Sequence, residues 1–300
     1  MRNHVRIALA ATALCAALAT ACSPAAPPTP TAPVPEPALP TVREATAGLP
    51  GHTVYRPADL AEYPDGGVPL IAWGNGACST SNLTISGYLT GLAAHGYIVI
   101  ANGAPEAQPV RTEPGTTLAR PDLLTAGIDW ALDTTASGQQ LHGKADPKRV
   151  AVAGTSCGGI EALLAGADPR VRSVVGLNTG FSTTPRFGGH DRGRLAALHS
   201  PTLLLNGGPT DVAYDNSRGD FAAITVPAAL VEATKAGHSG ISRGISEGDG
   251  DQPMLAAGLR VTTEWLRFTL DDDQQAKSRF LGPDCGWCTT PNWTVTTRNF

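Results

Sequence analysis

Apolar residues occur along this chain in two alternating arrangements. In the first, short continuous apolar runs stand between turn residues, which is typical of strands buried on both faces of a parallel sheet. In the second, longer segments carry apolar residues at every third or fourth position, which is typical of helices that pack on a sheet. The continuous runs predict strands at 52–56, 68–73, 97–101, 149–153, 171–177, 201–205 and 228–232. The periodic segments predict helices at 85–92, 121–132, 160–165 and 253–270.

Strands and helices therefore alternate along the chain. This order predicts an α/β fold in which helices cover both faces of a mostly parallel central sheet. About two dozen residues lie between Leu177 and Pro201, which is too few for a separate cap domain. We expect residues 49–300 to form one such α/β domain.

The beginning of the chain has the pattern of an export signal. Arg2 and Arg6 precede an apolar run from Ile7 to Leu18, and small residues at 19–21 form a cleavage site. The apolar run is too short to span a bilayer as a helix. We expect residues 1–21 to be a signal peptide that is removed on export.

Cys22 directly follows that cleavage site. The stretch Leu18–Cys22 resembles a bacterial lipobox, although the leucine stands four residues before the cysteine rather than three. Two outcomes remain open, namely a lipoprotein anchored to the cell membrane through Cys22 or cleavage after Ala21 and secretion. We favour the lipoprotein, because an exported protein rarely leaves a free cysteine at its new N-terminus.

Residues 22–48 are expected to be a proline-rich tether. Ser23 to Pro40 contains eight prolines in 18 residues, and such a segment cannot bury a core. A tether beside a lipid anchor would lift the following domain off the membrane. The alternative is a low-complexity segment without a role.

The overall charge narrows the range of partners. The formal net charge is −4 and the two signs are mixed along the chain, which argues against nucleic acid or an anionic surface as a partner. A membrane is expected as a partner only through the anchor at Cys22. No pattern indicates a cofactor or a metal site, so we expect neither, and the oligomeric state stays open.

Two segments match G-x-S-x-G, the pattern of a nucleophile elbow. The segment 154–158 follows a predicted strand and precedes a predicted helix, as an elbow requires. The segment 240–244 has no adjacent strand before it, runs into the polar stretch 247–251, and has no histidine after it. We therefore interpret Ser156 as a nucleophile and the second match as loop sequence.

Partners for Ser156 should follow later strands, because catalytic groups of parallel sheets lie on loops at the carboxyl ends of strands. Asp211 follows the strand expected at 201–205, and His238 follows the strand expected at 228–232. The order Ser, Asp, His is that of a triad in which histidine accepts the serine proton and aspartate orients the imidazole.

Each partner also has a simpler interpretation. An isolated Asp in a Gly-Pro-Thr loop is usually a turn residue, and an isolated Gly-His in a loop is usually exposed to solvent. Asp215 is the rival of Asp211. His199 precedes a strand at the wrong end, and His190 lies upstream of Asp211. The joint placement of three residues favours the triad.

Several segments together resemble the α/β-hydrolase superfamily. The closest branch is the lidless esterases, which include bacterial cutinase-like polyester hydrolases and dienelactone-hydrolase-like proteins. The resemblance covers about residues 50–270, and its motifs are specific to the superfamily but not to a substrate. The segments that carry it are Trp73–Cys78, Ala94–Ile100, the elbow at Ser156, Asp211 and Gly237–His238.

The resemblance implies a serine hydrolase that cleaves carboxylic esters through an acyl-enzyme on Ser156. It implies an oxyanion hole made by the backbone N–H groups of Cys157 and Ala77. Asn75 lies on the same loop, where many polyester hydrolases have other residues, and is a candidate substrate contact. Phe181, just past a strand end, is either a wall of the site or part of the core.

An open site without a cap would admit bulky or polymeric esters. Two other functions remain as alternatives at this stage. One is a surface lipoprotein that binds a ligand without turnover, and the other is a peptidase or acetyl-carbohydrate esterase on the same fold.

Four cysteines remain in the exported chain after Cys15 and Cys22 are set aside. Cys285 and Cys288 resemble a redox or zinc motif, but no helix is expected after them and no further ligands stand nearby, so we expect a local disulfide. Cys78 and Cys157 each follow or occupy an oxyanion position, so the resemblance brings them close together. We expect a disulfide there, with two buried free thiols as the alternative.

Overall fold

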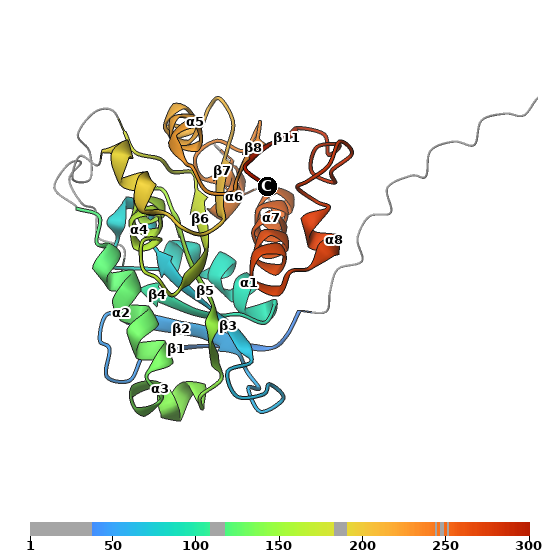
Figure 1. Cartoon of the computed structure of the whole chain (residues 1–300). Helices are drawn as coiled ribbons and strands as arrows, with labels where there is room; N and C mark the ends of the chain where they lie inside the picture. The colour runs from blue at the N-terminus through green and yellow to red at the C-terminus, as the bar shows by residue number, and fades with distance from the viewer. Residues whose placement is uncertain (1–37, 109–117, 183–190, 244, 247–248, 251) are drawn as a thin grey trace, which may run out of the picture. The chain divides into compact units, whose positions relative to one another are not determined.

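The computed structural model describes residues 38–108, 118–182, 191–243, 245–246, 249–250 and 252–300 (Figure 1). The expected signal peptide, Cys22 and the tether up to residue 37 lie outside the described residues, as does His190. The described residues from 38 onward form one compact unit. No helix in the described part of the chain has the length and apolar character needed to cross a membrane.

The centre of this unit is a nine-stranded sheet with the order β1-β2-β4-β3-β5-β6-β7-β8-β11. The strands from β4 to β8 in this order pair in parallel, whereas β1, β2 and β11 at the two edges pair antiparallel. The prediction of a mostly parallel α/β sheet is therefore confirmed. The strands are β1 Thr41–Ala45, β2 His52–Pro57, β3 Val68–Gly74, β4 Ile98–Asn102, β5 Ala145–Thr155, β6 Val171–Leu177, β7 Thr202–Asn206, β8 Ala228–Ala233 and β11 Trp293–Arg298.

Helices cover both faces of the sheet, as expected (Figure 1). One face carries α2, α3, α4 and α5, and the other carries α1, α6, α7 and α8. The α-helices are α1 Ser86–Ala94, α2 Pro121–Leu132, α3 Thr134–Leu141, α4 Cys157–Ala165, α5 Tyr214–Ala223, α6 Gly240–Arg243, α7 Gln252–Asp271 and α8 Gln274–Lys277. The short elements are the 3-10 turns η1 Gly76–Cys78, η2 Leu83–Ile85 and η3 Arg192–Ala197, and the paired strands β9 Ile245–Ser246 and β10 Asp249–Gly250.

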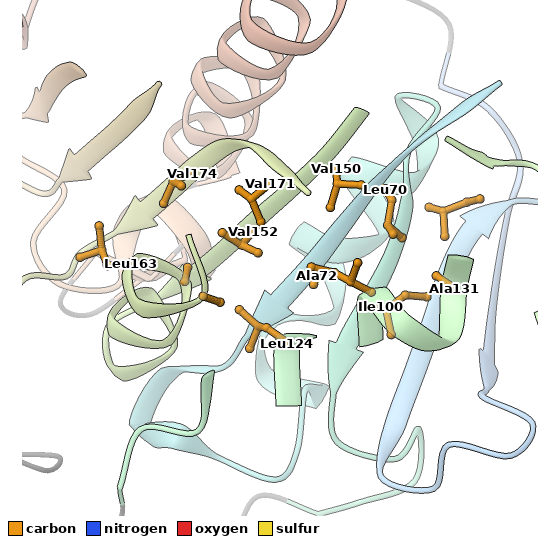
Figure 2. Packing of buried hydrophobic residues seen from close by; sticks show 14 of the residues in the cluster. Leu70, Ala72, Ile100, Leu124, Ala131, Val150, Val152, Leu163, Val171 and Val174 are labelled. Atoms are coloured by element: carbon orange, nitrogen blue, oxygen red, sulfur yellow. The ribbon is translucent and has the colours of Figure 1, made fainter. Parts of the chain in front are cut away.

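The core lies in two layers, one on each face of the sheet. Along β3, Leu70 and Ala72 belong to one layer and Ile71 and Trp73 to the other, which is why the strand is a continuous apolar run. Figure 2 shows the layer under α2 and α4, where helix residues pack on apolar side chains of the central strands. Its labelled residues are Leu70, Ala72, Ile100, Leu124, Ala131, Val150, Val152, Leu163, Val171 and Val174.

Two edge strands were not predicted. β1 lies inside the range expected for the tether, and β11 lies in the tail after the last predicted helix. Each is only partly buried and lacks a continuous apolar run, so its sequence carries no strong strand signal. β1 pairs with β2 and β11 pairs with β8. Backbone hydrogen bonds to the neighbouring strand therefore stabilise these two strands, although their own sequences have no strong strand pattern.

The segment 240–244 was expected to be loop, and this expectation is wrong. Residues Gly240–Arg243 form the short helix α6, while Gly244 lies outside the described residues. Ile241 packs in the core layer with α7, and Ser242 is buried. The local sequence of residues 240–244 does not specify a helix, and the burial of Ile241 in the core stabilises α6 instead.

A buried ion pair ties α5 to the segment after β6. The Asp220 carboxylate is fully buried, and it accepts hydrogen bonds from Arg192 Nε and from the Phe181 N–H, both at 2.7 Å. Burial raises the pKa of Asp220, and the hydrogen bonds from Phe181 and Arg192 lower it. Burial has the larger effect, so the pKa is raised to about 6. Because this pKa is raised, the carboxyl favours folding at low pH and opposes it once the pH rises above about 6.

We expect Arg192→Met to lower the free energy of unfolding by about 3 kcal/mol at pH 7. This is the lower end of the range for a broken buried pair, since the Arg192 side chain is 30 % exposed. The loss should shrink at pH 4, where Asp220 is protonated in the native state. Urea unfolding at both pH values measures this. Arg172→Met, at an exposed arginine, should change stability by less than about 0.5 kcal/mol, and an equal loss in both variants would contradict the assignment.

Candidate active site

Ser156 lies in a sharp turn between β5 and α4. Its backbone has a φ of 54° and a ψ of −120°, a conformation that L residues rarely adopt. Two hydrogen bonds hold the turn: the Ser156 N–H donates to the Leu177 carbonyl at 2.8 Å, and the Thr179 hydroxyl donates to the Ser156 carbonyl at 2.6 Å. Such a strained strand-to-helix turn places the serine hydroxyl at the carboxyl edge of the sheet.

The glycines on either side of Ser156 allow the backbones to touch. A Cβ on Gly158 would lie 2.0 Å from the carbonyl carbon of Gly74, and a Cβ on Gly154 would lie 2.2 Å from the Gly158 carbonyl oxygen. No larger residue fits at these positions without a shift of the backbone. The first turn of α4 therefore rests directly on the end of β3.

The structure brings Ser156, Asp211 and His238 into hydrogen-bond contact. His238 Nε2 lies 3.1 Å from Ser156 Oγ, and His238 Nδ1 lies 2.6 Å from Asp211 Oδ1. The three residues follow β5, β7 and β8, so parallel strands bring together groups that are far apart in the chain. Of the rival residues, Asp215 lies in the first turn of α5, and His199 contacts the Val171 carbonyl at the opposite edge of the sheet.

The environment of Asp211 favours its charged form. Burial alone would raise its pKa, but hydrogen bonds from His238, from the Gly207 and Ala213 N–H groups and from Asn178 outweigh it and lower the pKa. The two backbone donors lie at 3.0 and 2.9 Å from the carboxylate oxygens. Asp211 therefore remains a carboxylate that can accept a hydrogen bond from the N–H at His238 Nδ1.

Asn178 is a site residue that the sequence did not reveal. It follows β6 directly, has a φ of 48° and is fully buried. Its Nδ2 donates to Asp211 Oδ2 at 2.7 Å and to the Gly237 carbonyl at 3.2 Å, so one side chain links the aspartate to the residue before His238. Its place just past a predicted strand was the available signal, because the carboxyl edge of the sheet holds the site.

The loop expected to carry the second oxyanion donor lies against the elbow. Ala77 and Cys78 have φ values of 57° and 48° within the turn η1, and a Cβ on Gly76 would lie 3.9 Å from Ser156 Cβ. A disulfide joins Cys78 to Cys157, whose Cα atoms are 5.2 Å apart. The expected disulfide is present, and it links this turn to the first residue of α4.

Neither candidate substrate contact faces an open surface. Asn75 is 2 % exposed, and its Nδ2 donates to the carbonyls of Ser79 at 3.0 Å and Asn102 at 2.7 Å. Phe181 is 1 % exposed and packs in the core layer under α4. Asn75 thus holds the turn η1 in place, and Phe181 belongs to the core, which was the alternative interpretation.

The second G-x-S-x-G serine and the second pair of cysteines both lie outside the triad. Ser242, the serine of the second G-x-S-x-G, is buried behind the elbow, where its Oγ lies 3.4 Å from Thr155 Oγ1. A disulfide joins Cys285 to Cys288 between α8 and β11, as expected for a local bridge. Its Cα atoms are 5.1 Å apart.

The chain is similar to two fungal proteins over part of its length. Hydrolase ffsE of Aspergillus flavipes is 34 % identical over an alignment of 148 residues, which covers 47 % of this chain and 32 % of that protein. Hydrolase phmG of Phaeosphaeria nodorum is 31 % identical over 130 residues, or 43 % of this chain and 28 % of that protein. The match thus spans about a third of the length of these curated relatives. No family model matches the chain. The chain is a distant homologue of two fungal hydrolases, and its mostly parallel sheet is consistent with a hydrolase fold.

Proposed function

We propose that this protein is a serine hydrolase that cleaves carboxylic esters through an acyl-enzyme on Ser156. The observation that carries the proposal is the relay of contacts from Asp211 to His238 at 2.6 Å and from His238 to Ser156 at 3.1 Å. The strained turn that exposes the serine and the similarity to two proteins named as hydrolases support it.

In the first step, Ser156 Oγ attacks the carbonyl carbon of the ester while His238 Nε2 accepts the hydroxyl proton. Asp211 holds the imidazole in the tautomer with a proton on Nδ1 and stabilises the imidazolium that forms. His238 then gives the proton to the leaving alcohol, and the acyl group remains on Ser156. A water molecule activated by His238 releases the acid and restores the serine.

The negative charge of the tetrahedral intermediate needs donors that are already in place. The Cys157 N–H lies at the first position of α4, where the helix N-terminus also favours a negative charge. The Ala77 N–H lies on the turn that the disulfide joins to Cys157. We assign these two backbone groups to the oxyanion hole, where the loss of one donor typically costs about 3 kcal/mol of transition-state stabilisation.

The substrate class follows from the small amount of chain over the site. Between β6 and β7 the described residues form only η3 and short connections, and none of these described residues forms a further domain over the carboxyl edge of the sheet. An open site of this kind suits bulky or polymeric esters.

We place the enzyme outside the cytoplasm, anchored by a lipid on Cys22 or released by cleavage before it.

A fluorophosphonate probe on the chain from Cys22 onward tests the proposal. We expect stoichiometric labelling of Ser156, identified by peptide mass spectrometry, with normal labelling in Ser242→Ala and none in Ser156→Ala. A correctly folded protein that resists the probe would support a ligand-binding protein without turnover.

A substrate panel then tests the acyl bond and the open site. We expect hydrolysis of chromogenic acyl esters with retained rates as the acyl chain lengthens, and release of product from a soluble polyester. Faster cleavage of an aminoacyl amide would indicate a peptidase, whereas activity restricted to acetyl esters of carbohydrates would contradict the open site.

A further inference from the structure

Glu161 is a buried carboxyl that the proposed mechanism does not use. It lies on α4, one helical turn after Cys157, and is 1 % exposed. Its Oε1 accepts a hydrogen bond from the Arg120 N–H at 2.9 Å, and its Oε2 lies 3.3 Å from Asn102 Nδ2. A Cβ on Gly74 would lie 2.6 Å from Oε2, so the carboxyl fills the space beneath the loop that begins at residue 74.

The surroundings of Glu161 favour its neutral form. Burial raises its pKa to about 8, while the hydrogen bond from the Arg120 N–H lowers it. Two charged groups at the N-terminus of α2, Asp122 and Arg120, act on the Glu161 carboxyl. Their side chains form an ion pair with each other at 2.6 Å, and each side chain is 58 % exposed. Their opposite fields largely cancel at Glu161. The raised pKa therefore favours the protonated form of this side chain at neutral pH.

Asn102 offers an acceptor for that proton. Its Oδ1 is buried and has no hydrogen-bond partner, although its Nδ2 faces Glu161 Oε2. The oxygen and nitrogen of an asparagine amide exchange places when the group turns by 180°. In the turned orientation the protonated Glu161 donates to Asn102 Oδ1, and Nδ2 takes the buried position in which Oδ1 has no partner.

Asn102 in turn holds the oxyanion turn. Its backbone carbonyl, at the end of β4, accepts hydrogen bonds from Asn75 Nδ2 at 2.7 Å and from Asn82 Nδ2 at 2.9 Å. Asn75 Nδ2 also binds the Ser79 carbonyl and so closes the turn that carries Ala77. A connected set of buried polar groups thus runs from Glu161 through Asn102 and Asn75 to the turn.

We propose that Glu161 is a positioning residue for the oxyanion hole. In its neutral form it holds Asn102, and through Asn102 and Asn75 it holds the turn that carries Ala77 against α4, the helix that begins at Cys157. The inference rests on the proposed function, since it concerns the same two donors. Ionisation of Glu161 places a buried negative charge against Gly74 and reverses the hydrogen bond, so that Asn102 Nδ2 donates to the carboxylate and the groups that hold the turn shift. The expected consequence is a fall in kcat with little change in KM, because the donors act on the transition state.

The pH dependence of kcat in matched variants tests this role. For a short p-nitrophenyl ester between pH 6 and 10, we expect kcat of the unaltered protein to fall above about pH 8. Glu161→Gln, which stays neutral, should keep kcat at pH 7 within about threefold and lose the alkaline fall. Glu161→Leu should lower kcat at pH 7 by roughly tenfold, part of the loss expected for an absent donor. Asp220→Asn, at a buried carboxyl on another helix, should retain the alkaline fall.

An unchanged alkaline fall in Glu161→Gln overturns the proposal, as does an unchanged kcat in Glu161→Leu. If the leucine variant does not fold, the profile of the glutamine variant decides. Infrared difference spectra between the unaltered chain and Glu161→Gln add a readout that needs no turnover. The carboxylic-acid C=O band of Glu161 should be present at pH 7 and disappear above about pH 9. An ionised Glu161 at pH 7 refutes the inference, whereas a protein without esterase activity or probe labelling refutes the proposed function instead.

Discussion

Replacement of Ser156 by alanine is expected to lower kcat for ester hydrolysis by a factor of about 10⁶, which is typical for the loss of a triad nucleophile. The reason is geometric: Ser156 Oγ is the hydroxyl that lies 3.1 Å from His238 Nε2, at a turn whose backbone strain exposes it. The melting temperature should not fall, since alanine removes only a hydroxyl. Initial rates with a chromogenic ester and a thermal unfolding scan measure both quantities.

Ser242→Ala is the matched control for this experiment. Ser242 lies in the second G-x-S-x-G but is buried in α6, so its loss should leave kcat within about twofold of the unaltered protein. Rates that stay near the original value in Ser156→Ala, or that collapse in Ser242→Ala, would exclude the assigned nucleophile.

The second large effect is expected when the Cys78–Cys157 disulfide is removed by a double change to alanine. The bridge closes a loop between residues 79 positions apart, and the entropic model assigns such a loop about 4 kcal/mol of stability. It also joins the Ala77 turn to Cys157, the residue that we assign as the other oxyanion donor. We therefore expect kcat to fall by about 10²-fold, the effect of one misplaced donor, with little change in KM.

The second disulfide provides the control. Cys285 and Cys288 are three positions apart, so their double change to alanine should cost about 2 kcal/mol by the same model. It should leave kcat unchanged, since this bridge lies between α8 and β11. Urea unfolding and steady-state kinetics on both double variants measure the contrast. Equal losses of kcat in the two variants would show that the first bridge has no special role at the site.

Most elements of the fold were predictable because they carry strong local patterns. The strand at 171–177 and the helix at 121–132 have the predicted boundaries, since each is a complete apolar run or period with a clear beginning. β5 begins earlier than expected, at Ala145, because the pairing of Val68 with Ala145 extends it beyond the apolar run. β1, β11 and the helices α3, α5, α6 and α8 were not predicted. Pairing or burial rather than local sequence stabilises β1, β11 and α6.

The candidate site shows a similar division. Ser156, Asp211 and His238 were identified from their places after strands, because parallel strands place their carboxyl ends at one edge of the sheet. Asn178 and Glu161 were not identified, since a single asparagine or glutamate next to a strand or within a helix has no distinguishing pattern. Asn75 was expected to contact the substrate, but its side chain is buried against backbone carbonyls, because sequence does not indicate whether a side chain faces the backbone or the solvent.

The sequence by itself determined the alternation of buried strands and helices and the order of Ser156, Asp211 and His238. These depend on periodicity and on chain order, which are properties of the sequence alone. Only the tertiary structure decided which buried polar groups meet, including Asn178 with Asp211 and Glu161 with Asn102. Such contacts join segments that are distant in the chain, and their geometry depends on the packing of the sheet and its helices rather than on any local pattern.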